Sequence, residues 1–382
     1  MTDTNHSNLT LAPRLPPELW FLIFRHATDA LWSTSHVYRP FQARFASGDV
    51  CDAALHVKHA IVRVCKQWRA LGADVFYEDI RAGPGLPALI QTLDQQHPEN
   101  IPRRWVRRVV LPYTHSDTPT WRPTPAVQLM ELCADIDVLV RPPLPSGHPY
   151  VLRFDFPTTT PTFARLRRID WWQHNDAART DGINALDDVL RHAPHVEHLV
   201  LGGDFHLTAL RQQRLVLPRL HTVHMRRVNA LGVRQLCMWT LPALAHLVVE
   251  TPLPPQEACE AVWEKYGPQL QVVELGAAGD QLAAVLAACP AVVELNYHAR
   301  ATCLPRGVGH DTLQRVGLFV EEREDMWRDV EEHLSGYPKD DFPALTQFVL
   351  YGRDWACILA NPRFREMEES LKMVGRSIVL EA

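Results

Sequence analysis

A run of apolar residues near the N-terminus is unbroken from Leu19 to Phe24. It follows Pro16 and Pro17, which suit the entry and first turn of a helix because backbone N–H groups there lack helical partners. Glu18 places a negative charge near the positive end of the helix dipole. A surface helix usually carries one apolar stripe, whereas this helix is apolar nearly all round. The pattern therefore predicts a helix that buries two faces, one of them against a second protein.

A second amphipathic segment, from Val57 to Leu71, can cover the first of these faces because its apolar residues recur mainly at spacings of three and four. A short apolar tail with Phe76, Tyr77 and Ile80 follows it. We expect a disordered tail over residues 1–12 and a small all-α module over residues 13–82, with an ordered insertion or local loop at about 28–58. A module of about seventy residues is near the lower size limit for independent folding and gains stability by docking on another protein.

Beyond the glycine- and proline-rich stretch at 81–85 the pattern becomes a repeat. Its template is Pro-x-L-x-x-L-x-L, where L is any apolar residue, and some copies lack the proline. The ten copies start at residues 104, 134, 164, 194, 218, 242, 268, 290, 311 and 343. Each copy alternates as a strand does, and helical patterns fill gaps such as 86–93, 183–190, 282–289 and 326–334. One strand and one helix per repeat predicts an α/β solenoid over residues 84–382.

The end of the chain predicts a helix from Asn361 to Leu380 that covers the last repeat. Pro362 falls in its first turn, as is common in helices. The apolar stripe of this helix comprises Phe364, Met367, Leu371, Val374 and Ile378. A solenoid needs such a cap over its last open core.

The N-terminal residues resemble an F-box, in which Leu-Pro-x-Glu-Leu opens the first helix and Val-Cys-basic-x-Trp-Arg lies in a later one. Here the matching stretches are LPPELWFLIF, VCKQWRAL and VFYEDI. The resemblance implies that this module docks onto the Skp adaptor of a cullin–RING ubiquitin ligase. The implied adaptor-binding residues are Leu15, Pro16, Glu18, Leu19, Ile23, Phe24, Val64, Cys65, Trp68 and Arg69. The repeats look like the degenerate leucine-rich repeats that follow F-boxes, although a regular Asn after each strand is absent.

In such a horseshoe of parallel strands the L positions point into the core, and the residues between and after them face the concave surface. We predict that this surface binds a protein substrate through anchors such as Trp172 and Arg226. The predicted substrate-binding residues are Arg168, Asp170, Trp172, His198, His224, Arg226, His246, Glu250, Glu274, Glu294, His298 and Phe319. The same register includes Arg108, Thr222, Asn296, Arg315, Gln347 and Tyr351. The early strands contribute Arg and His and the later ones Glu, which predicts a charge asymmetry; an ordinary solvated sheet face is the alternative.

The composition narrows the possible environments of the chain. Its 382 residues are 46% hydrophobic, as in globular proteins, and favour two or three domains. A formal net charge of −5 gives no support for nucleic-acid or membrane binding. No apolar run is long enough to span a membrane, and no signal peptide is evident. The eight cysteines form no C-x-x-C pair, which favours reduced, buried thiols and an intracellular location, cytoplasmic or nuclear.

Catalytic and metal-binding patterns are missing from the sequence. There is no G-x-S-x-G, H-E-x-x-H, phosphate-binding loop or dinucleotide glycine pattern, so we expect no enzyme activity and no cofactor. His192, His195 and His198 have a metal-like spacing, but Pro194 ends any helix there and His198 belongs to a predicted strand. We therefore expect histidines on an exposed sheet face rather than a metal site.

The sequence thus predicts a non-catalytic α/β protein, with a small all-α F-box module followed by a leucine-rich-repeat solenoid. The resemblance implies a substrate-recruiting subunit of a Skp-cullin-F-box ubiquitin ligase. Two other classes remain open: a leucine-rich-repeat interaction scaffold with no ligase role, and a hydrolase or ligand-binding enzyme. Adaptor capture separates the first of these from the ligase subunit, and a deep polar pocket would favour the second.

Overall fold

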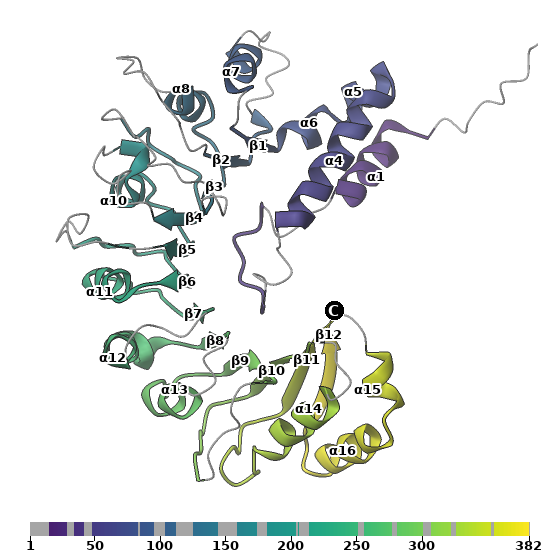
Figure 1. Cartoon of the computed structure of the whole chain (residues 1–382), viewed down its shortest axis with the longest axis vertical. Coiled ribbons are helices and arrows are strands. Elements are labelled where there is room, and N and C mark those ends of the chain that lie inside the picture. Colours follow the sequence, from purple (N-terminus) through teal and green to yellow (C-terminus); the bar gives the residue numbers. More distant parts are fainter. Residues whose placement is uncertain are drawn as a thin grey trace, which may run out of the picture.

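Twelve parallel strands form one sheet in the computed structural model of the chain, and their order in the sheet is their order in the sequence. The model describes residues 15–28, 34–41, 48–82, 85–94, 104–111, 125–143, 159–173, 182–203, 205, 214–250, 256–276, 281–300, 307–321, 326–352 and 355–381. The sheet curves, with helices along its outer, convex side (Figure 1). The α/β prediction is therefore confirmed.

The strands are short, and each pairs with its neighbours in parallel. They are β1 (Asp79–Arg81), β2 (Arg108–Val110), β3 (Val138–Arg141), β4 (Arg168–Gln173), β5 (His198–Gly203), β6 (Thr222–Val228), β7 (His246–Val249), β8 (Val272–Leu275), β9 (Glu294–His298), β10 (Arg315–Phe319), β11 (Gln347–Tyr351) and β12 (Ser377–Glu381). Each of the ten repeat copies coincides with one strand from β2 to β11. The L positions of the template are buried in one continuous core, as predicted.

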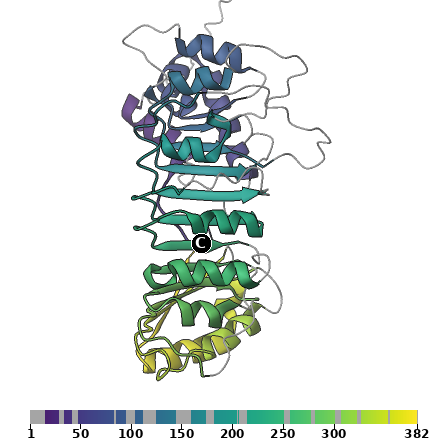
Figure 2. The same cartoon turned by 90° about the vertical axis from the view of Figure 1, so that its left-hand side faces the viewer.

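Helices connect most of the strands and cover the convex side, where they stack along the long axis of the molecule (Figure 2). They are α7 (Leu86–Asp94), α8 (Pro125–Leu132), η2 (Gly182–Asn184), α10 (Leu186–Arg191), α11 (Ala230–Met238), α12 (Gln256–Tyr266), η4 (Gly267–Gln269), α13 (Leu282–Ala288), α14 (Met326–Ser335), α15 (Ala356–Ala360) and α16 (Pro362–Met373). The apolar side chains of these helices and the L positions of the strands fill the space between the two layers. None of the described helices combines the length and apolarity needed to cross a membrane.

Four helices precede or adjoin the sheet at its N-terminal end: α1 (Pro17–Thr28), α4 (Gly48–Val64), α5 (Lys66–Leu71) and α6 (Ala73–Tyr77). Phe24, Ile61 and Val75 form their small core, which is separate from the core under the sheet. Trp68 packs on both Phe24 and Trp20, with ring centroids 4.9 and 4.8 Å away. The aromatic residues of α1 thus fix this helix on α4 and α5.

Three features of this region differ from the predicted ones. The helix expected over Val57–Leu71 is divided at Cys65, whose extended backbone starts α5 and whose Sγ accepts from the Trp68 N–H. The preceding helix α4 begins at Gly48, within the predicted insertion at 28–58. The sheet begins at Asp79, before the expected boundary at residue 84, because Ile80 is buried in the sheet core. The predicted tail at 1–12 lies outside the described residues.

The predicted helix from Asn361 to Leu380 is too long. Helix α16 ends at Met373, and Ser377–Glu381 forms β12, which pairs with β11. Gly375 adopts a positive φ of 77° and the Arg376 N–H bonds to the Leu371 carbonyl, which is how many helices terminate. Ile378 and Val379 then belong to a strand, as their branched side chains favour.

Candidate protein-interaction surfaces

The first candidate surface is the outer face of α1. Leu19, Leu22 and Ile23 are 44%, 59% and 44% exposed, while Phe24 on the opposite side is 1% exposed. Their spacing places them on one side of a helix, with Phe24 on the other. This helix therefore buries one apolar face in its own module and leaves a second one open.

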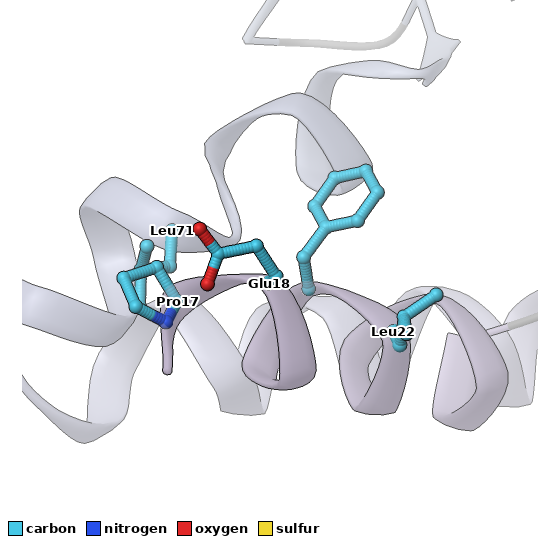
Figure 3. Close-up of a pocket in the computed structure, with 5 residues that line it drawn as sticks. Pro17, Glu18, Leu22 and Leu71 are labelled. Carbon is cyan, nitrogen blue, oxygen red and sulfur yellow. The ribbon is translucent and has the colours of Figure 1, made fainter. Parts of the chain in front are cut away.

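An open hollow borders this face, between α1 and α5 (Figure 3). Pro17, Glu18, Phe21, Leu22 and Leu71 line it. The lining is apolar except for the Glu18 carboxylate at the first turn of α1. A partner would meet apolar surface with one negative charge at its edge.

The structure separates the residues that the F-box resemblance nominates for adaptor binding. Pro16, Glu18, Leu19, Ile23, Val64, Cys65 and Arg69 are exposed, and Leu15 is half-buried. Phe24 is a buried core residue, and Trp68 is half-buried and packs against it, so these two side chains help to hold the module together. The resemblance did not nominate Leu22, although its spacing from Leu19 puts it on the same face.

The second candidate surface is the concave face, and a segment of the chain itself lies on it. Residues 35–41, which follow α1 and are here called the strap, run inside the curve of the sheet (Figure 1). The Ser35 carbonyl accepts from Arg168 on β4 at 2.9 Å, and the His36 carbonyl lies 3.2 Å from His198 Nδ1 on β5. The sequence had indicated an ordered insertion or a local loop here, but not where it lies.

Two aromatic side chains anchor the strap further along the sheet. The Tyr38 hydroxyl and the Phe41 N–H both donate to Glu274 Oε2, each at 2.8 Å. The Asn296 amide in turn donates to the Tyr38 hydroxyl at 2.9 Å. The Tyr38 ring lies 5.2 Å from the His246 ring. One carboxylate on β8 therefore receives both a side-chain and a backbone donor from the strap.

The Phe41 side chain fills an aromatic pocket over the last strands. Its ring centroid lies 5.9 Å from that of His298, 5.2 Å from that of Phe319 and 5.2 Å from that of Tyr351. Phe41, Val349 and Tyr351 are all buried and form a third small core on the concave side. The strap therefore spans the sheet from β4 to β11.

The remaining predicted substrate-binding residues lie beside the strap. Glu250 pairs with Arg226 at 3.0 Å and lies 3.5 Å from His224. Trp172 packs over Gly202 of β5, where a Cβ would come within 2.6 Å of the indole. Glu294 accepts from Asn296 at 2.7 Å and pairs with Arg315 at 3.2 Å. Hydrogen bonds through Asn296 connect Glu294 to the strap. Glu250, Arg226 and His224 form a second group.

Burial changes the charges of this face. It lowers the pKa of His198 to about 3, with a further effect of Arg168, and it also lowers the pKa of His224. Burial raises the pKa of Glu274 to about 7, although the donors from Phe41 and Tyr38 oppose the shift. Both histidines are neutral at pH 7, and the Glu274 carboxyl keeps its proton to a higher pH than an ordinary glutamate does. The charge asymmetry expected from the sequence is therefore weaker than the residue types suggested.

Histidine placement corrects one expectation about this face. His198 is 3% exposed and lies under the strap, whereas the sequence predicted a histidine on an exposed sheet face. Within the described ranges, no group of three or more His, Cys, Asp or Glu residues could hold a metal ion. Cys65, Cys237 and Cys289, which belong to those ranges, are free thiols.

The comparisons with known proteins give no family. No family model matches the chain, and no curated protein matches it. The class that the observations define is an α/β protein with one curved parallel sheet and two surfaces suited to protein contacts.

Proposed function

We propose that this chain is a substrate-receptor subunit of a Skp-cullin-F-box ubiquitin ligase. In this proposal α1, α4, α5 and α6 form an F-box module that binds the Skp adaptor, and the sheet with its outer helices is a leucine-rich-repeat horseshoe that binds a protein substrate. The chain itself performs no chemistry. It holds the substrate near the charged carrier bound elsewhere in the ligase, which raises the effective concentration of the reactants.

The observation that carries the proposal is the second apolar face of α1. Leu19, Leu22 and Ile23 are about half exposed in a helix whose opposite face is already packed. Burying the remainder of such side chains stabilises a complex by roughly 1 kcal/mol each. The adjoining motif residues, from Leu-Pro-x-Glu-Leu to Val-Cys-basic-x-Trp-Arg, support an adaptor of the Skp type as the partner. A scaffold with no ligase role would not capture this adaptor.

Charge substitutions on α1 test the adaptor surface. Leu19→Asp and Ile23→Asp each place a carboxylate where the proposal has apolar contact, and desolvating it costs several kcal/mol. We expect each to weaken capture of the Skp adaptor about a hundredfold or more, which corresponds to roughly 3 kcal/mol. Co-purification and titration calorimetry with the adaptor measure this effect.

Met373→Asp is the matched control, since Met373 is 88% exposed and lies at the opposite end of the molecule on α16. It should bind the adaptor as the unchanged chain does. Absence of capture by the unchanged chain, or equal capture by both α1 variants, would reject the adaptor surface.

A further inference from the structure

The strap contacts the sheet in the way that a bound peptide contacts its receptor. Arg168 donates to the Ser35 carbonyl, His198 faces the His36 carbonyl, and Glu274 accepts from the Phe41 N–H. These three contacts recognise main-chain atoms, so they do not depend on the sequence of the segment. Peptide-recognition sites combine such main-chain hydrogen bonds with pockets for selected side chains.

Selectivity on this surface comes from two positions of the strap. Tyr38 meets Glu274, Asn296 and the His246 ring, and Phe41 occupies the pocket of His298, Phe319 and Tyr351. Val37, between the main-chain contacts and Tyr38, is 60% exposed. The surface therefore selects Tyr and Phe three positions apart and leaves Val37 and Arg39 exposed to solvent.

The charged groups under the strap also fit a ligand better than a permanent core. Arg168 is 7% exposed and holds Asp170 through two hydrogen bonds of 2.7 and 2.9 Å, and Glu274 is 5% exposed. Burying such groups costs free energy even when they are paired. A sheet face that served only to be covered would be more stable with apolar side chains in these positions.

Backbone strain lies at the end of the strap. Phe41 adopts φ = 56°, a left-handed conformation that is uncommon for a bulky side chain. Such a conformation persists only where the surrounding contacts impose it. Here the Glu274 hydrogen bond and the aromatic pocket do so, and the strain is released when the strap leaves the sheet.

We propose that the concave face from β4 to β11 is a binding site for an extended segment of a partner protein with Tyr and Phe at i and i+3, and that the strap is its internal occupant. The partner segment takes the place of residues 35–41. The identification of this partner as the ligase substrate rests on the proposed function. The contacts by which the site recognises the segment do not depend on that function.

A labelled peptide of residues 34–41 tests the site in trans. In the full chain, Tyr38→Ala with Phe41→Ala removes both anchors of the internal occupant. We expect the peptide to bind this variant about tenfold or more tightly than the unchanged chain, because a tethered occupant competes at a high effective concentration. Fluorescence anisotropy measures both affinities.

Two controls accompany this titration. A peptide with Ala at both anchor positions should not bind, and adding Glu274→Ala to the opened variant should abolish binding. No binding to a folded opened variant, or equal binding by the opened and unchanged chains, would overturn the proposal.

Hydrogen exchange of the unchanged chain keeps the proposal testable should the opened variant fail to fold. We expect the Phe41 amide to exchange through local opening, on the order of a hundredfold or more faster than the Leu295 amide in β9. Saturating peptide should accelerate it further. If both amides exchanged only by global unfolding, the strap would be a permanent part of the fold and the proposal would be wrong.

Adaptor capture measured on the same preparations separates the two proposals. The strap variants leave the Leu19 and Ile23 face unchanged, so they should still bind the adaptor. Peptide binding without adaptor capture supports the peptide site and rejects the ligase role, whereas adaptor capture without peptide binding does the reverse.

Discussion

Asp170 and Glu274 lie in the same row of the concave face, but their pKa values are shifted in opposite directions. Burial alone would raise the pKa of Asp170, but the paired Arg168 guanidinium lowers it below its ordinary value. No cation among the described residues plays this part for Glu274, and burial raises its pKa to about 7. Around it are the Tyr38 hydroxyl, the Phe41 N–H, Asn296 and the carboxylates of Glu250 and Glu294. Its charged form is therefore stabilised by two hydrogen bonds and opposed by burial and by the carboxylates of Glu250 and Glu294.

The raised pKa of Glu274 predicts a pH dependence of stability. A carboxyl whose folded pKa exceeds its unfolded value contributes most below about pH 4.5 and destabilises the fold as pH rises to about 7. Glu274→Gln removes this dependence, which changes the free energy of unfolding by on the order of 3 kcal/mol. Urea unfolding at pH 5 and pH 8 should show a smaller loss for this variant than for the unchanged chain.

Glu369→Gln, at an exposed position of α16, is the control and should follow the unchanged chain. If the Glu274→Gln and unchanged profiles ran parallel between pH 5 and pH 8, the buried carboxyl would not be the cause.

At the scale of elements, the end of the chain depends on one buried arginine. Arg376 precedes β12 and donates to the carbonyls of Tyr337, Pro338, Phe342 and Leu345. It is 4% exposed, and Tyr337, Phe342 and Leu345 are buried as well. The segment before β11 and the start of β12 are thereby held together.

Arg376→Met should destabilise the chain by roughly 3 kcal/mol, because it removes the side-chain donor of the buried Tyr337 and Leu345 carbonyls. Arg363→Met is the control: that side chain is 69% exposed and its ion pair with Glu331 contributes about 0.5 kcal/mol. Chemical unfolding of both variants tests the contrast, and similar losses would show that the Arg376 hydrogen bonds contribute little.

Local pattern predicted the strands that share the repeat template and failed where the structure depends on distant contacts. The ten copies coincide with β2 to β11 because an alternating apolar pattern before a helix needs only neighbouring repeats to form a strand. The strand β12 was missed because Val374 and Ile378 continued a helical stripe across Gly375. The position of the strap had no local signal, since Tyr38 and Phe41 contact residues more than 200 positions away. On α1, the exposure of Leu19 and Ile23 could be predicted from the apolar pattern, whereas the burial of Phe24 required the packed helices.

At the scale of the whole molecule, the strap is a second connection across an otherwise sequential array. Consecutive strands contact only their neighbours in the sheet, so small changes of angle between them add up along its length. The strap joins β4 and β5 at its start to the pocket over β9 to β11 at its end. It therefore restricts how far the curve can open.

Removing both anchors should make the molecule more extended. We expect Tyr38→Ala with Phe41→Ala to increase the radius of gyration in small-angle scattering, without loss of helix or strand signal in circular dichroism. An unchanged scattering profile from a variant whose strap has been released would show that the sheet sets its own curvature.

The pocket for Phe41 is completed only late in the synthesis of the chain. Phe41 leaves the ribosome about three hundred residues before Tyr351, which completes the pocket. At about 5–20 residues per second, this delay is roughly 15 to 60 s. During that interval the nascent chain displays an aromatic segment that has nowhere to dock, and a chain that stopped short of β10 would display it permanently.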